Sequence, residues 1–264
     1  MPEIALPVPV FARSVQGAGP GLLLAHGAGG SVAGNYGPIL DGLAANRTVV
    51  GADYPGTGAT PRSAAPLTLD GLADQLVAAA VAEGLETFAV VGYSLGTAVA
   101  IRAAVRHPER VTALVLTAPV ARPDAALRRL AARWRHLHTS GAHVPLARYL
   151  TPLALGTSAL AAMSSDELDA LVRETARSLP PGGGDHADLV VRTDVREDLA
   201  RIAVPVLVIS TTEDFMVGPE LHHEVAEGIP GARLVGIPTG HLPFAERPEA
   251  WLALITDFLD HLER

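Results

Sequence analysis

Short apolar runs alternate with longer amphipathic stretches along most of the chain. The apolar runs are Leu22–Ala25, Thr48–Ala52, Phe88–Val91, Ala113–Leu116, Pro205–Ile209 and Arg233–Ile237. Each run is nearly continuous in apolar residues, which is typical of a strand buried on both faces of a parallel sheet. The intervening stretches, such as Leu69–Glu83 and Leu95–Arg106, predict helices. The pattern therefore predicts an α/β fold with a mostly parallel sheet and helices on both of its faces.

The first residues carry a different pattern. Ile4–Val8 and Val10–Ser14 are short apolar stretches that contain or flank prolines. Because proline cannot donate a ladder hydrogen bond, it suits the edge of a sheet and not its centre. We therefore expect these two stretches to form an antiparallel hairpin at one edge.

The alternation stops after Pro119 and resumes near Pro205. Between them, Asp124–His138 places its apolar side chains on one helical face. Ser164 and Glu167 have the spacing of a capping box, which predicts a helix over Asp166–Leu179. The run Pro180–Gly184 is expected to end that helix as a flexible connection. The chain thus divides into an α/β core domain, residues 1–119 and 196–264, and a helical insertion, residues 120–195, expected to act as a mobile cap or lid.

Composition narrows the chemistry. The chain has 264 residues, no cysteine, and a net charge of −8, and all 20 of its basic residues are arginine. Without cysteine there is no disulfide, thiolate zinc site or cysteine nucleophile, and without lysine there is no Schiff-base chemistry. The acidic balance disfavours nucleic acid and anionic lipid as partners. We expect no cofactor, no metal, no membrane span and no signal peptide, and hence a cytoplasmic protein; a homo-oligomer stays open.

One five-residue motif carries a nucleophile. Gly92-Tyr93-Ser94-Leu95-Gly96 follows a predicted strand and precedes a helix of small residues. This is the context of a nucleophile elbow, in which a tight turn leaves no room for Cβ atoms beside the serine. The turn exposes the hydroxyl of Ser94, and it places the N–H of Leu95 at a helix N-terminus, where it can stabilise an oxyanion.

A second glycine-rich stretch, His26–Gly30, directly follows the strand Leu22–Ala25. Its backbone N–H groups are free to face an anion. Ala28 is the candidate for the second oxyanion donor, and Gly27 is the alternative. The spacing does not match a phosphate-binding loop, because G-x-G-x-x-G is absent.

Taken together, these motifs resemble the α/β-hydrolase superfamily over nearly the whole chain. The matching stretches are, in order, His26–Gly27, Asp53–Gly58, Gly92–Gly96, Val204–Ile209 with Glu213–Asp214, and Gly240–His241 with Glu246–Pro248. Two departures stand out. Thr211-Thr212 occupies a place where the family often has glycine, and the first strands are short, so we expect fewer than eight strands.

The resemblance, with its order of serine, acid and histidine, implies a catalytic triad of Ser94, Asp214 and His241. Each of the three follows a predicted strand, and an open parallel sheet places its ligand crevice at the strand ends. Glu213 and Asp124 are alternatives for the acid. Among the other histidines, His26 is expected to have a structural role beside the oxyanion loop, and the pair His222 and His223 is expected to be solvated.

The substrate is less well defined. Gly27, Tyr93, Trp134, Tyr149 and Met163 are candidate substrate-binding residues, although those in the insertion fit the insertion's own core equally well. The arginines around Trp134 are expected to form a solvated helix face. The resemblance implies a serine hydrolase that cleaves a carboxylic ester, thioester or lactone with a largely apolar acyl group. Acyl transfer, perhydrolysis, carbon–carbon bond hydrolysis and a non-catalytic ligand-binding protein are the alternatives.

Overall fold

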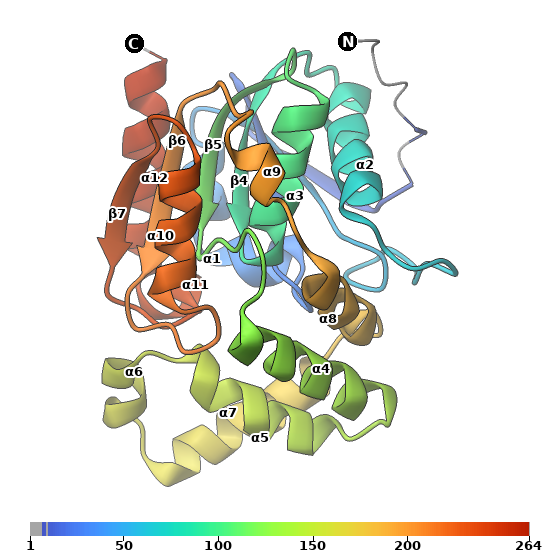
Figure 1. Cartoon of the computed structure of the whole chain (residues 1–264), viewed down its shortest axis with the longest axis vertical. Coiled ribbons are helices and arrows are strands. Elements are labelled where there is room, and N and C mark those ends of the chain that lie inside the picture. The colour runs from blue at the N-terminus through green and yellow to red at the C-terminus, as the bar shows by residue number, and fades with distance from the viewer. Residues whose placement is uncertain (1–6, 9, 264) are drawn as a thin grey trace.

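A computed structural model describes residues 7, 8 and 10–263, and its centre is a seven-stranded sheet (Figure 1). The strands are β1 (Arg13–Gln16), β2 (Gly21–Ala25), β3 (Thr48–Ala52), β4 (Phe88–Tyr93), β5 (Val111–Thr117), β6 (Val206–Thr211) and β7 (Arg233–Ile237). Their order across the sheet is β1-β3-β2-β4-β5-β6-β7, and every pairing except β1 with β3 is parallel. The predicted mostly parallel sheet of fewer than eight strands is thereby confirmed.

The predicted N-terminal hairpin is wrong where it can be examined. Most of Ile4–Val8 lies outside the described residues, and the observed strand β1 begins only at Arg13 and pairs with β3. The backbone just before β1 bonds to side chains instead. Val10 N–H donates to Gln75 Oε1 (2.9 Å), and Ala12 N–H donates to Thr60 Oγ1 (2.8 Å). These bonds satisfy the backbone that a second hairpin strand was expected to pair.

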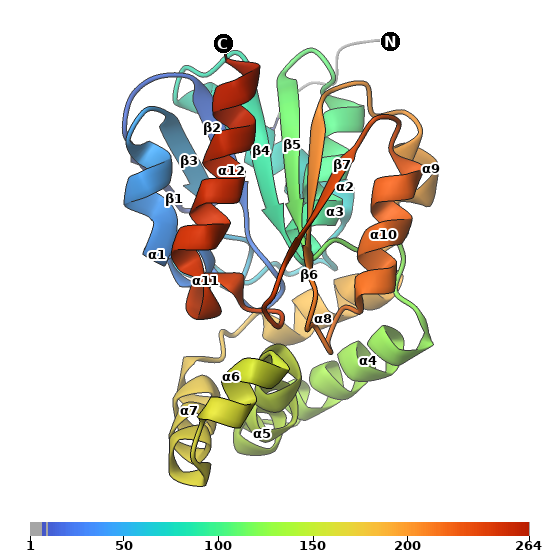
Figure 2. The same ribbon diagram turned by 90° about the vertical axis from the view of Figure 1, so that its left-hand side faces the viewer.

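Helices cover both faces of the sheet (Figure 2). One face carries α1 (Val32–Ala44) and α12 (Pro248–Leu262), with the short α11 (Pro243–Glu246) beside them. The other carries α2 (Leu69–Ala82), α3 (Leu95–Arg106), α9 (Arg196–Leu199) and α10 (Pro219–Gly228). Strands β2 to β6 are almost fully buried, which explains why their sequences are apolar on both sides and not alternating. The edge strands β1 and β7 are largely exposed.

Five further helices form a separate layer at the end of the sheet where the parallel strands finish, at the bottom of Figure 1. They are α4 (Ala125–Thr139), α5 (His143–Ala154), α6 (Thr157–Ala162), α7 (Ser165–Ser178) and α8 (Gly183–Arg192). We call them the helical layer. The predicted helix after Asp124 is present, and Ser164 and Glu167 form both hydrogen bonds of the capping box at the start of α7. That the layer acts as a lid stays a prediction.

The run Pro180–Gly184 is not the expected flexible connection. Gly182, Gly183 and Gly184 are buried, and Gly182 N–H donates to Gly56 O (2.9 Å). A Cβ on Gly182 would approach Pro55 O to 2.5 Å. The glycines are therefore required for a close approach between the start of α8 and the loop after β3, and this junction is packed.

We expect the helical layer to open unevenly, with residues 157–178 exchanging their amide hydrogens faster than α8. Helix α6 buries no side chain and α7 buries only Val172 and Ala176, whereas α8 buries six residues. Local opening exposes little apolar surface where few side chains are buried. Hydrogen exchange followed by mass spectrometry measures this difference, with the sheet strands as the slow reference. Equal protection of α7 and α8 would contradict it.

Candidate active site

A strained turn connects β4 to α3. Ser94 has φ 52° and ψ −121°, a conformation that costs a non-glycine residue on the order of 1–3 kcal/mol. Its flanking glycines are required sterically. A Cβ on Gly92 would lie 2.7 Å from Gly96 O, and a Cβ on Gly96 would overlap Ala25 O. The predicted elbow is thus present, and close backbone packing on both sides holds its strained serine.

The three predicted triad residues lie together in one chain of hydrogen bonds. The Ser94 Oγ–His241 Nε2 distance is 3.0 Å, and the His241 Nδ1–Asp214 Oδ2 distance is 2.6 Å. Since a carboxylate only accepts, His241 Nδ1 carries the proton and Nε2 is left to accept from the serine hydroxyl. This arrangement can remove a proton from Ser94 as the hydroxyl attacks a carbonyl carbon.

The Asp214 carboxylate is buried and fully engaged. Its Oδ1 accepts from Met216 N–H and Val217 N–H, both at 2.9 Å, and its Oδ2 accepts from Thr211 Oγ1 at 2.8 Å as well as from His241. Burial by itself raises the pKa of Asp214, but the positive charge of His241 and these donors outweigh it and lower the pKa. The carboxylate therefore stays ionised beside the imidazole.

The two alternative acids have other partners. Glu213 accepts from Ser158 N–H (3.1 Å) and Ser158 Oγ (3.3 Å) at the start of α6. Asp124 caps α4 by accepting from Leu127 N–H (2.7 Å). Of the three acids that the sequence left open, Asp214 is therefore the one bonded to His241.

The glycine-rich loop after β2 has one unoccupied N–H group. Gly27 N–H donates to Asn35 Oδ1 (3.0 Å), Gly29 N–H to His186 Nδ1 (3.0 Å) and Gly30 N–H to Gly27 O (3.2 Å). Ala28 N–H alone has no acceptor among the described residues. Of the two oxyanion candidates in this loop, the hydrogen bonds thus leave Ala28 available and occupy Gly27.

The N–H of Leu95 is the matching group on the other side of Ser94. Leu95 is the first residue of α3, where a helix offers its N–H groups no internal acceptor. Ala28, Ser94, Leu95 and His241 all line one cavity. The N–H groups of Ala28 and Leu95 are therefore the candidates to bind a carbonyl oxygen above Ser94, and that of Leu95 lies at the positive end of a helix.

Comparison with known proteins agrees with this geometry. A family model described as "alpha/beta hydrolase fold" matches residues 20–248. The chain belongs to this hydrolase family. It is 32% identical over 247 residues to pyrrolizixenacetamide deacetylase of Xenorhabdus hominickii, covering 93% of this chain and 92% of that protein. It is 31% identical over 229 residues to pimeloyl-[acyl-carrier protein] methyl ester esterase of Neisseria meningitidis, covering 84% and 87%.

Among solved structures, a thermophilic esterase from Thermogutta terrifontis superimposes with a TM-score of 0.82 at 27% identity, covering 96% of this chain and 94% of that one. The chain is thus an enzyme of the alpha/beta hydrolase type. Nearly its whole length takes part in the likeness, and this includes the helical layer.

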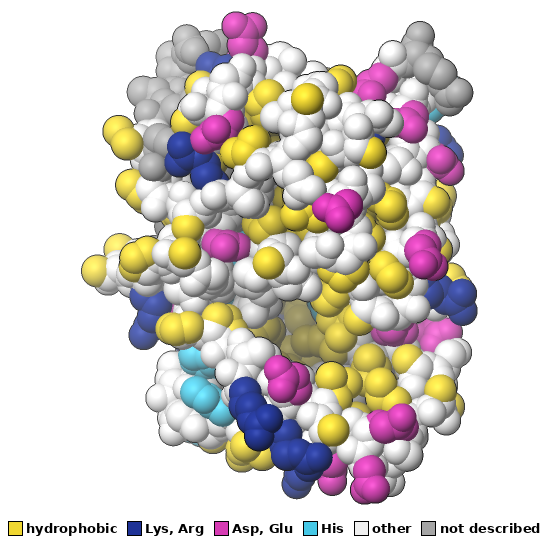
Figure 3. Space-filling model, turned by 180° about the vertical axis from the view of Figure 1, so that it is seen from behind, with side chains coloured by type: hydrophobic (Ala, Val, Ile, Leu, Met, Phe, Trp, Pro, Cys, Tyr) yellow, Lys and Arg dark blue, Asp and Glu magenta, His cyan; other side chains and the backbone are white. Residues whose placement is uncertain are grey.

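The cavity of the hydrolase is apolar and uncharged. It holds about 230 Å³ and lies between the strand ends and the helical layer, where Figure 3 shows hydrophobic side chains around a hollow. Its apolar wall consists of Val120, Leu127, Leu130, Ala131, Trp134, Leu150, Ala154, Leu171, Leu179, Val190, Met216, Val217 and Leu242. Among its described lining residues there is no aspartate, glutamate or arginine. A neutral, largely apolar group fits such a wall.

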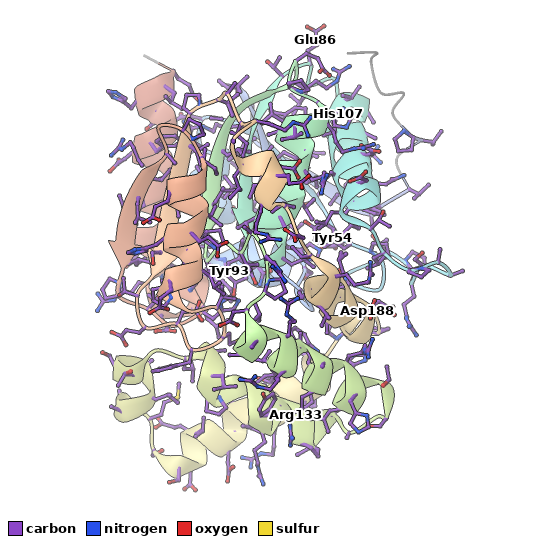
Figure 4. All side chains as sticks on the ribbon, in the orientation of Figure 1. Tyr54, Glu86, Tyr93, His107, Arg133 and Asp188 are labelled. Carbon is purple, nitrogen blue, oxygen red and sulfur yellow. The ribbon has the colours of Figure 1, made fainter. Side chains whose placement is uncertain are left out.

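The candidate substrate-binding residues divide into two groups. Tyr93 and Trp134 line the cavity, whereas Gly27, Tyr149 and Met163 are not among the lining residues. Arg133 lies in α4 on the side away from the sheet (Figure 4), with its guanidinium 5.0 Å from the centre of the Tyr149 ring. Met163 caps the end of α6. The helical periodicity of apolar residues in the sequence did not indicate which of these side chains line the cavity.

Tyr93 has a second role, which the sequence pattern did not indicate. Its hydroxyl donates to the carbonyl oxygen of His241 (2.6 Å), and the two rings are 5.3 Å apart. Burial raises the pKa of Tyr93 well above its ordinary value, so the hydroxyl keeps its proton. Tyr93 therefore anchors the backbone of the histidine loop to the nucleophile turn.

The expectation that His222 is solvated is wrong, while His223 is exposed as expected. His222 is fully buried in α10, with its Nδ1 3.0 Å from Ser210 Oγ, and burial lowers its pKa to about 4. His26 is also fully buried, and burial lowers its pKa to about 3. The predicted exposed position after Pro219 is wrong for His222, because α10 directs this side chain toward Ser210 of β6.

No group of three or more histidine, aspartate or glutamate side chains within residues 7, 8 and 10–263 is arranged to hold a metal ion. In the same part of the chain, no helix is long and apolar enough to cross a membrane.

Acid should destabilise the fold through these buried histidines. Unfolding restores an ordinary histidine pKa of 6.5, so below that value the unfolded chain binds more protons and the free energy of unfolding falls as the pH falls. Between pH 7 and pH 5 the loss is about 2 kcal/mol for each such histidine. His222→Gln should remove about that much of the loss measured by urea unfolding.

The neighbouring exposed histidine provides the control. His223→Gln should show the same pH dependence as the wild type, because the side chain of His223 is exposed and is not part of the buried interior. Identical pH profiles for the wild type and His222→Gln would contradict the burial argument.

Proposed function

We propose that this hydrolase cleaves a carboxylic ester, thioester or lactone through an acyl-enzyme formed on Ser94. The observation that carries the proposal is the unbroken chain from Ser94 Oγ through His241 to Asp214, at the wall of an apolar cavity. The two relatives are a deacetylase and a methyl ester esterase, which supports hydrolysis of an acyl group.

In the first half of the reaction, Ser94 Oγ attacks the substrate carbonyl carbon while His241 Nε2 takes the serine proton. The carbonyl oxygen becomes an oxyanion, which the N–H groups of Ala28 and Leu95 stabilise. Asp214 stabilises the imidazolium and holds its tautomer. His241 then returns the proton to the leaving alcohol or thiol, and the ester bond breaks.

In the second half, water takes the place of the leaving group. His241 removes a proton from this water, the hydroxide attacks the acyl carbon, and the bond to Ser94 Oγ breaks as the serine regains its proton. The products are a carboxylic acid and free enzyme, and no redox step or cofactor is involved.

The cavity supports a neutral acyl group as the preferred substrate part. A charged group would lose its hydration against the uncharged wall without gaining an ion pair.

Residues 120–195 act in this proposal as the cap over the site. Leu130, Trp134, Leu150 and Leu171 of the helical layer all line the cavity that Ser94 opens into. Covering the site excludes bulk water and strengthens the hydrogen bonds made to the oxyanion.

Ser94→Ala should abolish ester hydrolysis without unfolding the protein. The substitution removes the nucleophile, but Ser94 already has a Cβ, so the turn is sterically unchanged. We expect the wild type to hydrolyse p-nitrophenyl esters of neutral acids and a fluorophosphonate probe to label Ser94. Turnover by a folded Ser94→Ala enzyme would exclude the mechanism, and a wild type that neither turns over esters nor reacts with the probe would indicate a binding protein.

Asp214→Asn should lower kcat by about 10² to 10⁴-fold, because the amide no longer holds the productive imidazole tautomer. The adjacent carboxylate provides a matched control. Glu213→Gln should leave kcat within about threefold of the wild type, since Glu213 contacts α6 and not the histidine. Steady-state kinetics on one p-nitrophenyl ester compares them, and the reverse order of effects would move the catalytic acid to Glu213.

A further inference from the structure

A buried histidine of the helical layer contacts the oxyanion loop. His186 lies on α8, is fully buried, and is separated from that loop by more than 150 positions. Its Nδ1 is 3.0 Å from Gly29 N, and its Nε2 is 3.0 Å from Pro55 O in the loop after β3. One imidazole thus joins the helical layer to two loops of the core.

The two contacts fix the protonation state of the ring. The N–H of Gly29 can only donate, so Nδ1 of His186 must be the unprotonated acceptor. The carbonyl of Pro55 can only accept, so Nε2 must carry the hydrogen. Only the neutral imidazole with its hydrogen on Nε2 satisfies both partners. Burial lowers the pKa of His186, which favours this neutral form.

A second buried imidazole is arranged in the opposite sense. His26 Nδ1 is 2.8 Å from Gly27 O and must donate to it, while His26 Nε2 accepts from Tyr54 N–H at 2.9 Å. The centres of the His26 and His186 rings are 6.2 Å apart. A proton on either ring would remove one of these acceptors and would place a charge beside the other ring.

The contact made by His186 lies next to the oxyanion donor. Gly29 has φ +66°, so the chain turns sharply after Ala28. Directly after Ala28, the N–H of Gly29 donates to His186. Directly before Ala28, the N–H of Gly27 donates to Asn35 of α1. The free Ala28 N–H therefore lies between two anchored groups, one bonded to the core and the other to the helical layer.

We propose that His186 is a positioning residue of the oxyanion hole, which aims the Ala28 N–H by accepting the hydrogen bond of Gly29. The helical layer then completes the catalytic machinery and does more than cover it. This inference rests on the proposed function, because it needs a reaction in which an oxyanion forms.

A displaced oxyanion donor has a recognisable kinetic signature. The oxyanion carries full charge only in the transition state and the tetrahedral intermediate, so losing its alignment lowers kcat and leaves KM nearly unchanged. A role limited to packing would instead lower stability without this division between kcat and KM.

Two substitutions separate the two contacts of the ring. In His186→Asn the side-chain oxygen can take the place of Nδ1 and accept from Gly29, whereas the contact with Pro55 is lost. In His186→Gln the amide nitrogen can take the place of Nε2 and donate to Pro55, whereas the acceptor for Gly29 is lost. Both variants keep a neutral polar side chain.

We expect His186→Gln to lower kcat for a p-nitrophenyl ester at least about tenfold with KM little changed, and His186→Asn to retain most of the wild-type kcat. An alkyl boronic acid, which forms an adduct with Ser94 that mimics the tetrahedral intermediate, should lose affinity for His186→Gln in proportion to kcat. Equal kcat values for the two folded variants, or a change confined to KM, would overturn the inference.

A measurement on the wild type covers the case in which a variant does not fold. A long-range ¹H–¹⁵N NMR spectrum at neutral pH should show His186 with Nδ1 unprotonated and Nε2 protonated, and a proton on Nδ1 would overturn the inference. If the wild type itself turned over no ester, the proposed function would fail, whereas the Asn and Gln comparison in an active enzyme tests His186 alone.

Discussion

The close approach of the N-terminus of α3 to the end of β2 determines the geometry of the whole site. At Gly96 the two backbones are so near that a Cβ would overlap the carbonyl group of Ala25 and meet His26 O at 2.7 Å. This contact places the nucleophile turn directly beside the glycine-rich loop. Backbone packing thus sets how near Ser94 lies to the glycine-rich loop, and the side chains of Asn35 and His186 then hold the N–H groups on either side of Ala28.

The catalytic loops are held from two sides. The core positions them through strand ends and through Tyr93, whose hydroxyl binds the His241 carbonyl. The helical layer contributes Ala154, whose carbonyl accepts from His241 N–H at 2.8 Å, and Ser158, which binds Glu213 beside Asp214. The end of α5 is thereby bonded directly to the histidine loop, whereas α7 has few buried side chains.

The sequence predicts those features that local chemistry determines. The six apolar runs predicted six strands, and Gly92 with Gly96 identified Ser94, because a strained turn has strict steric needs. Asp214 could be ranked above Glu213 and Asp124 but not separated from them, since only the packed loops show which carboxylate meets the imidazole of His241.

Contacts between distant segments could not be predicted in this way. Asn35 and His186 hold the glycine-rich loop after β2, yet neither belongs to a motif, and His186 lies just after the run Pro180–Gly184 that suggested flexibility. The strand at Arg13–Gln16 was placed too early, because Gln75 and Thr60 bind the preceding backbone. In each case a hydrogen bond to a residue distant in the sequence determines the local structure, and a local sequence pattern carries no information about that residue.

The uncharged cavity wall also bears on how a catalytic cycle ends. Hydrolysis converts a neutral acyl group into a carboxylic acid, which ionises at neutral pH. The new anion would face an apolar wall that offers it no arginine, with the ionised Asp214 behind His241. Burying an unpaired charge in such surroundings is unfavourable, so the reaction itself turns a well-bound group into a poorly bound one. In the proposed reaction, the same wall that favours the neutral substrate would therefore expel the product and keep product inhibition weak.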